Sequence, residues 1–232
     1  GAAYTTDDRV ELPSHALIPG LVNAHTHAAM TLLRGIADDM PLMEWLNGHI
    51  WPAEARWVDA DFVRDGTTLA VAEMLRSGTT CFNDMYFYPD VTARVAASCG
   101  MRACVGLIVI DFPTVWAKDA GEYISKGLAV HDRFRGDSLV QTVFAPHAPY
   151  TVSDQPLEHI RTLADEMDIG IHMHIHETAE EVDRAVELTG KRPLVSVAPR
   201  STILPEAVSI LFSSSGRCMT PSFATAAVTT SI

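Results

Sequence analysis

Short apolar runs alternate along the chain, from residue 16 onward, with longer stretches in which apolar residues recur at the helical period. The apolar runs predict strands at residues 17–27, 79–86, 102–111, 139–144 and 170–176. The longer stretches predict helices between them, most clearly at residues 61–76, 91–98, 120–134 and 155–167. Strands and helices that alternate in this way are typical of βα units around a parallel sheet.

Capping residues support these boundaries. Asp59 stands where the helix at residues 61–76 needs an N-cap, and Gly78 stands where that helix must stop. Thr178 and Glu181 form a Thr-x-x-Glu capping box ahead of a further helix. The chain is therefore predicted to contain five βα units by about residue 190.

An α/β fold of five such units is an incomplete (β/α)8, or TIM-type, barrel. Each of the three remaining units would need roughly 30 residues. Only 38 residues follow Leu194. We therefore expect the barrel to occupy residues 16–194 and not to close within this chain.

Residues 195–232 differ in character from the barrel segment. They are rich in Ser and Thr, and only Arg200, Glu206 and Arg217 carry charge. Two interpretations stay open: a polar, poorly ordered C-terminal segment, or an atypical tail that is not native to the fold.

Composition narrows the classes of partner. With 17 basic and 29 acidic residues, the formal net charge is −12, which would repel nucleic acid and anionic membranes. No apolar run approaches the roughly 20 residues that a membrane helix needs, and the first residues carry no secretory signal. We expect a soluble, cytoplasmic protein that binds neither nucleic acid nor membrane. The four cysteines fit reduced, buried thiols better than disulfides.

Candidate chemistry begins at the end of the first predicted strand. Residues two apart on a strand face the same side, so His25 and His27 direct both imidazoles toward one point. Neutral imidazole is a common ligand of zinc and other divalent ions, and barrel enzymes hold their chemistry at this end of the strands. The pair predicts half of a divalent-metal site; the alternative is two incidental histidines.

The fifth predicted strand supplies a second group of candidates. His172, His174 and His176 alternate along it, and Glu177 follows directly. Any of these imidazoles could bind a metal, and a carboxylate three residues past His174 could move protons to and from a metal-activated water. Glu177 could instead be a helix-start acid that the helix dipole favours.

Three further residues could contact a substrate. His147, in a Pro-framed loop after the fourth predicted strand, could donate a hydrogen bond or only structure that loop. Trp45 could stack on a heteroaromatic ring while Glu44 hydrogen-bonds the same ring. Trp45 could equally belong to the core.

These motifs resemble the amidohydrolase superfamily, in particular the branch that contains 5′-methylthioadenosine/S-adenosylhomocysteine deaminases and triazine hydrolases. The stretches that carry the resemblance are LIPGLVNAHTH at residues 17–27, LRG at 33–35, PLMEWL at 41–46, SGTT at 77–80, APHAPY at 145–150 and HIHET at 174–178. The resemblance extends over about residues 10–194.

The resemblance implies a role for each candidate. His25, His27 and His174 match three ligands of a single divalent metal, which is zinc or, alternatively, iron. Glu177 matches the general acid/base. Three residues match substrate contacts: His147, Glu44 and Trp45. The implied reaction is hydrolytic deamination of the adenine of methylthioadenosine or S-adenosylhomocysteine, with release of ammonia; the alternative enzyme hydrolyses triazines or other aminoheterocycles.

The family pattern also includes parts that have no counterpart in this sequence. Its later His-containing and Asp-containing strands cannot be matched, since no His follows His176 and no Asp follows Asp183. Residues 1–15 would be only a remnant of a flanking β-sandwich. A third possibility is therefore a shortened chain with little or no activity by itself. The open edge of its sheet predicts self-association into a homo-oligomer.

Overall fold

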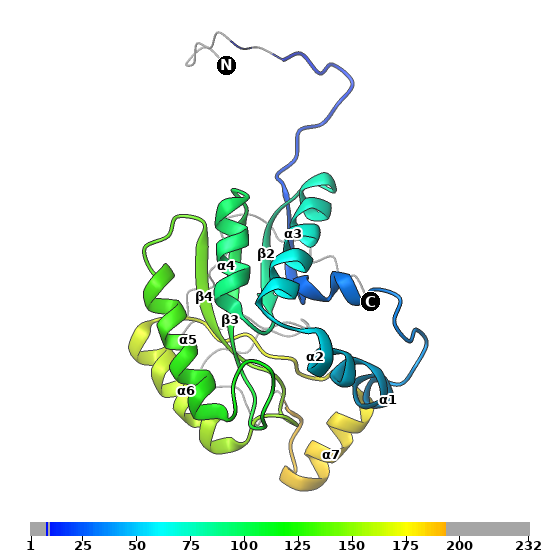
Figure 1. The fold of residues 1–232 in the computed structure, drawn as a ribbon, viewed down its shortest axis with the longest axis vertical. Coiled ribbons are helices and arrows are strands. Elements are labelled where there is room, and N and C mark those ends of the chain that lie inside the picture. Colours follow the sequence, from blue (N-terminus) through cyan, green and yellow to red (C-terminus); the bar gives the residue numbers. More distant parts are fainter. Residues whose placement is uncertain (1–7, 9, 194–232) are drawn as a thin grey trace.

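The computed structural model describes residue 8 and residues 10–193, and its centre is a four-stranded parallel sheet (Figure 1). The strands neighbour one another in chain order: β1 (Leu21–Thr26), β2 (Thr79–Met85), β3 (Arg102–Val109) and β4 (Val140–Pro146). This is the α/β arrangement of a partial TIM-type barrel, which confirms the predicted fold class. The tail predicted at residues 195–232 and most of the predicted N-terminal remnant lie outside the described residues.

Helices connect the strands, and the longer ones that precede β2, β3 and β4 and that follow β4 pack against the sheet (Figure 1). Between β1 and β2 lie the 3-10 helix η1 (Ala28–Leu33), α1 (Leu42–Trp45), the π-helical turn η2 (Leu46–Ile50), α2 (Trp51–Trp57) and α3 (Ala60–Arg76). The later helices are α4 (Pro89–Ser98), α5 (Ala120–Phe134), α6 (Asp154–Met167) and α7 (Ala179–Thr189).

The hydrophobic core lies between this helical layer and the sheet. Helices contribute buried side chains such as Val63 and Tyr123, and the strands contribute Phe82, Leu107 and Phe144. Side chains alternate along a strand, so this burial also fixes which strand residues face the opposite side of the sheet. The candidate site lies at the carboxyl ends of the strands.

Two strands differ from their predicted bounds by more than two residues. β1 begins at Leu21 and not at residue 17, because Pro19 has no N–H to donate to a ladder, and the residues around it are exposed. The predicted strand at residues 170–176 is wrong as a regular strand. It follows the end of β4 through one parallel bridge, between Ile171 and Phe144. Pro146 offers no N–H where the ladder would continue, so the next contact runs from the His174 N–H to the His147 carbonyl, at 3.0 Å.

The predicted helix caps are confirmed. The Asp59 carboxylate accepts a hydrogen bond from the Phe62 N–H at 2.8 Å, and the Thr178 hydroxyl accepts one from the Glu181 N–H at 3.1 Å. The Glu181 carboxylate reaches further back than a capping box requires. It accepts hydrogen bonds from the backbone N–H groups of His176 and Glu177, at 3.1 and 2.8 Å, and so fixes the chain where Glu177 stands.

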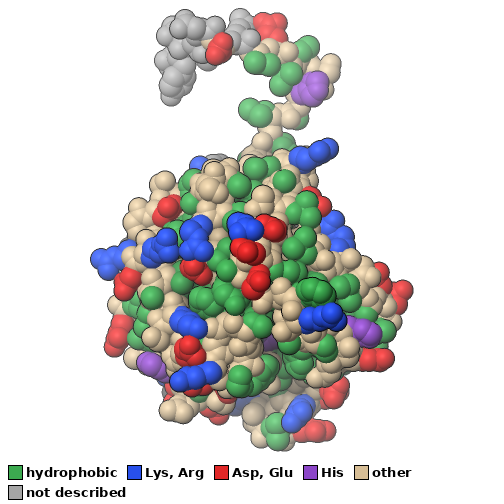
Figure 2. All heavy atoms as spheres, in the orientation of Figure 1, with side chains coloured by type: hydrophobic (Ala, Val, Ile, Leu, Met, Phe, Trp, Pro, Cys, Tyr) green, Lys and Arg blue, Asp and Glu red, His purple; other side chains and the backbone are tan. Residues whose placement is uncertain are grey.

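The surface mixes both signs of charge. On the face that Figure 2 presents, basic and acidic side chains are interspersed among apolar ones, and the segment before β1 projects away from the body. Within residues 10–193, no helix is long and apolar enough to cross a membrane.

Helix α3 approaches η1 closely at Gly66. A Cβ atom at this position would lie 2.4 Å from the carbonyl oxygen of Ala29 and 2.9 Å from its Cα. Ala29 lies two residues after His27, so the absence of a side chain at Gly66 lets α3 support the turn that follows β1.

We expect Gly66→Ala to lower the free energy of unfolding by about 1–3 kcal/mol, because the added methyl group overlaps backbone that cannot give way. The matched control is Gly48→Ala, since a Cβ at Gly48 meets nothing within 4 Å. Urea unfolding followed by circular dichroism measures both variants. Equal stabilities for the two would contradict the close approach.

Candidate metal centre

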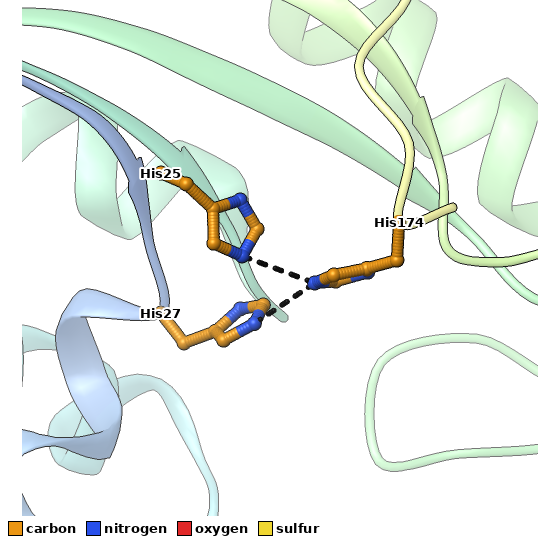
Figure 3. A group of neighbouring side chains, drawn as sticks. All are labelled: His25, His27 and His174. Carbon is orange, nitrogen blue, oxygen red and sulfur yellow. Dashed lines mark hydrogen bonds between the residues drawn. The ribbon is translucent and has the colours of Figure 1, made fainter. Parts of the chain in front are cut away.

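Three imidazoles converge at the carboxyl end of the sheet, where His25 and His27 leave β1 and His174 arrives from the segment beside β4 (Figure 3). The Nε2 atom of His174 lies 3.1 Å from Nε2 of His25 and 3.1 Å from Nε2 of His27. One ligand atom from each residue can be chosen so that all three lie within 4.8 Å of one another. The structure therefore brings together the three residues that the sequence analysis selects as ligands.

Backbone carbonyls decide which nitrogen of two of these rings carries the proton. His27 Nδ1 lies 2.5 Å from the Met85 carbonyl oxygen, and His174 Nδ1 lies 2.9 Å from the His147 carbonyl oxygen. A carbonyl oxygen can only accept, so both Nδ1 atoms donate. In the neutral rings, both Nε2 atoms then present lone pairs.

Two lone pairs that face each other at 3.1 Å repel unless a positive centre lies between them. Zn–N distances of about 2.0–2.1 Å in a tetrahedral site correspond to nitrogen–nitrogen separations of about 3.3 Å. The spacing and the donor set of this cluster therefore fit a divalent cation of the zinc type. His25, His27 and His174 could hold it.

Burial keeps His25 and His174 neutral. It is the largest cause that lowers the pKa of His25 to about 3, with the neighbouring imidazoles adding to the effect. The pKa values of His147 and His172 are likewise lowered to about 3, and that of His174 lies well below its ordinary value. Metal ligation needs neutral imidazole, so this environment favours a cation over protons.

A buried aspartate fixes the backbone around His27. One carboxylate oxygen of Asp84 accepts hydrogen bonds from the Thr26 hydroxyl and from the Ala28 N–H, each at 2.7 Å. These two residues flank His27, and the neighbouring Met85 holds its ring. The end of β2 therefore positions both the main chain and the imidazole of this ligand.

The three alternating histidines of the 170–176 segment do different things. His174 joins the cluster, and His172 lies behind His25 with its Nε2 atom 2.9 Å from His25 Nδ1. His176 is exposed and has a backbone φ of 63°, because the chain has left its extended course there. The structure thus separates the alternatives that the sequence leaves open.

A cavity of about 290 Å³ adjoins the cluster, beside the segment that runs from α1 to α2. His27, His147 and His174 contribute to its lining, and most of the rest is apolar, including the aromatic rings of Trp45, Trp51 and Phe112. An apolar cavity with a few convergent polar groups is the usual form of a site for a small organic molecule.

Glu177 also lines this cavity, and its Oε2 accepts a hydrogen bond from the Tyr150 hydroxyl at 2.6 Å. Desolvation is the largest influence on this carboxyl and raises its pKa. A carboxyl with a raised pKa that lines the same cavity as the histidine cluster is suited to act as a general acid and base.

His147 lines the cavity with a defined tautomer. Its Nδ1 atom lies 2.9 Å from the Thr151 hydroxyl, whose own proton is donated to the Ala148 carbonyl. His147 Nδ1 is therefore the donor, and its Nε2 atom remains an acceptor.

The two predicted substrate contacts in α1, Glu44 and Trp45, differ in their position relative to the cavity. Trp45 lines the cavity and donates its indole N–H to the Ile36 carbonyl at 3.2 Å. Glu44 is exposed and does not line this cavity among the described residues.

Sequence reasoning does not single out Glu54, a second acid that lines the cavity. Only 8% of Glu54 is exposed, its carboxylate accepts a hydrogen bond from the Tyr86 hydroxyl at 2.7 Å, and burial raises its pKa to about 7. The signal that could have found it is helical spacing. Glu54 continues the buried stripe of Leu46 and Ile50 at intervals of four, and an acid in an apolar stripe indicates a special role.

The chain is similar in sequence to known deaminases. It is 54% identical over 202 residues to the 5-methylthioadenosine/S-adenosylhomocysteine deaminase of Saccharophagus degradans, a match that covers 87% of this chain and 45% of that protein. The chain thus spans about half the length of the curated relatives that it matches.

The chain is also similar in fold to solved structures. An adenosine deaminase from Xanthomonas campestris with bound zinc has a TM-score of 0.75 and 57% identity, covering 77% of this chain and 41% of that one. An atrazine chlorohydrolase from Arthrobacter aurescens, complexed with zinc, has a TM-score of 0.68 at 20% identity, covering 77% and 45% respectively. The second likeness concerns the fold alone. Because the model of the amidohydrolase family matches residues 16–228, the chain belongs to that family.

Proposed function

We propose that this chain is a metal-dependent hydrolytic deaminase, with methylthioadenosine and S-adenosylhomocysteine as substrates and His25, His27 and His174 as ligands of one zinc ion. The observation that carries the proposal is the convergence of these imidazoles beside an apolar cavity that also contains Glu177. The deaminase names of relatives at 40–54% identity support the reaction. Zinc is favoured over iron by the zinc-bound relative at 57% identity.

A divalent ion in such a site supplies a nucleophile near neutral pH by acidifying water. The residues of the chain would handle the proton and the substrate. Glu177 would take the proton from that water and pass it to the departing amine, and the Tyr150 hydroxyl would hold its carboxyl in place. The Nε2 acceptor of His147 would hydrogen-bond a protonated ring nitrogen of the purine.

The apolar lining suits the rest of such a substrate. The rings of Trp45 and Trp51 would pack on the purine or the thioether. Tyr86 donates to only one carboxylate oxygen of Glu54, and the other oxygen would accept hydrogen bonds from ribose hydroxyls. Glu44 stays a predicted contact that its exposed position in the described residues does not favour.

The alternative is hydrolysis of triazines or other aminoheterocycles, which needs the same nucleophile. The likeness to the atrazine chlorohydrolase rests on fold at 20% identity, so the adenine thioethers are favoured. Two further expectations remain predictions: self-association into a homo-oligomer, and domain boundaries near residues 15 and 194.

We expect the zinc-loaded protein to release ammonia from methylthioadenosine and S-adenosylhomocysteine in preference to a panel of triazines. Glu177→Gln should lower kcat by about 10²–10⁴-fold while zinc content stays the same, because only the proton transfer is lost. Glu180→Gln, on an exposed residue of α7, is the control. Turnover of triazines alone would refute the substrate assignment.

We expect His174→Ala to remove most bound zinc, because this ring lies against both other ligands. Zinc per protein after dialysis, measured by atomic emission, gives the result. His159→Ala changes an exposed histidine of α6 and should leave zinc content as it was. Full zinc occupancy in His174→Ala would count against the ligand set.

We expect Glu54→Gln to stabilise the fold in a pH-dependent way. Burial raises the pKa of Glu54 from 4.5 to about 7, so the folded state favours the protonated carboxyl. Below pH 4.5 the carboxyl is protonated in both states and costs nothing. Between pH 4.5 and 7 the folded protein loses stability as the pH rises, up to a total on the order of 3 kcal/mol.

Gln cannot ionise, so the stability difference between Glu54→Gln and the unmodified protein should grow from pH 4.5 to 7 and then level off. Urea unfolding at several pH values measures this difference, in which the other titrating groups cancel. A difference that does not depend on pH would argue against the buried, protonated carboxyl.

A further inference from the structure

A fourth histidine, His172, contacts the metal cluster from behind. Its Nε2 atom lies 2.9 Å from Nδ1 of His25, and the two rings meet nearly at right angles with their centroids 5.0 Å apart. The contact is therefore made to the side of the His25 ring that faces away from the cluster, since His25 meets His174 through Nε2. His172 belongs to the support of the cluster and not to its ligand set.

The structure holds His172 firmly in this position. Its side chain is fully buried, with 0% of the residue exposed, and its backbone N–H donates to the Phe144 carbonyl at 2.8 Å. Its other ring nitrogen, Nδ1, is buried and has no hydrogen-bond partner among the described residues. Among the described residues, the His172 ring therefore makes one hydrogen bond, the one with His25.

We propose that His172 is a positioning residue of the metal centre: its Nε2 atom accepts the Nδ1–H of His25 and keeps His25 in the tautomer whose Nε2 is free for the metal. The inference rests on the metal centre of the proposed function, and it does not depend on which molecule is hydrolysed.

The other two ligands support this assignment by comparison. His27 and His174 each donate from Nδ1 to a backbone carbonyl, and a carbonyl can only accept. His25 has a side-chain imidazole in the corresponding place, and an imidazole nitrogen can donate as well as accept. If His172 donated instead, the proton of His25 would move to Nε2, and the atom that faces His174 could no longer bind a metal.

The consequence is that metal binding and the tautomer of His172 are linked. A cation on His25 requires the proton of His172 to be on Nδ1, so any group that accepts from His25 at this position should preserve the site. A Gln side chain can place its amide oxygen near the position of the imidazole Nε2. A Phe side chain fills the same space and accepts nothing.

The experiment measures the zinc affinity of the full 232-residue protein by competition with a chromophoric chelator. We expect His172→Phe to bind zinc about 10–100-fold more weakly, as is typical when the hydrogen-bond partner of a metal ligand is removed. We expect His172→Gln to bind zinc nearly as tightly as the unmodified protein. This recovery is the result that a merely space-filling role of His172 would not produce.

His131→Phe is the matched control. His131 is a half-buried histidine of α5 that hydrogen-bonds the Thr142 hydroxyl at 2.7 Å, and it takes no part in the cluster. We expect this variant to lose some stability and to keep its zinc affinity. Unfolding curves of the metal-free variants separate a general loss of structure from a loss of metal binding.

Two affinity results would overturn the proposal: zinc binding in His172→Phe as tight as in the unmodified protein, or binding in His172→Gln as weak as in His172→Phe. If His172→Phe does not fold, the unmodified protein decides the question. With ¹⁵N-labelled histidine and zinc bound, a scalar coupling between His25 Nδ1 and His172 Nε2 would report the hydrogen bond. Absence of this coupling would overturn the proposal.

The outcomes also distinguish this inference from the proposed function. A protein that binds no zinc would overturn both the centre and the role of His172. Zinc binding with the expected pattern of variants, but without adenine deamination, would overturn only the proposed reaction.

Discussion

Two backbone carbonyls, those of Met85 and His147, each accept a hydrogen bond from Nδ1 of a cluster histidine. This pairing determines much of what the site can do. It turns the Nε2 lone pairs of His27 and His174 toward one point, and burial disfavours protonation of His25 and His174. Without fixed acceptors on the far side of each ring, three imidazoles this close would rotate away from one another.

The fold supplies those acceptors from separate elements. β2 provides Met85 and also Asp84, whose carboxylate holds the backbone on both sides of His27. The loop after β4 provides the carbonyl of His147, and the irregular segment beside it delivers His174. Because Pro146 interrupts the β4 ladder, the segment that carries His174 turns toward β1 and brings this ligand to the cluster. The close approach of α3 at Gly66 supports the same turn from the helical side.

The cavity beside the cluster combines an apolar lining with two carboxyl groups of raised pKa, Glu54 and Glu177. Their surroundings differ. Glu54 is deeply buried and shares a hydrogen bond with Tyr86, whereas Glu177 stands at the start of α7, where Glu181 fixes its backbone. A buried acid is suited to hold a polar part of a ligand, and a more accessible acid that lines the same cavity as His27 and His174 is suited to move a proton.

The sequence by itself determined the βα order, the helix caps and the pair of ligands on β1, because these depend on local periodicity, on capping chemistry and on the two-residue repeat of a strand. It could not decide which of His172, His174 and His176 faces that pair, since the segment is not a regular strand and its course depends on the end of β4. It selected Glu44 and did not single out Glu54, because the burial of an acid depends on the tertiary packing around α2. Only the tertiary structure decided these points, since each depends on residues far apart in the chain that must share one hydrogen bond or one buried space.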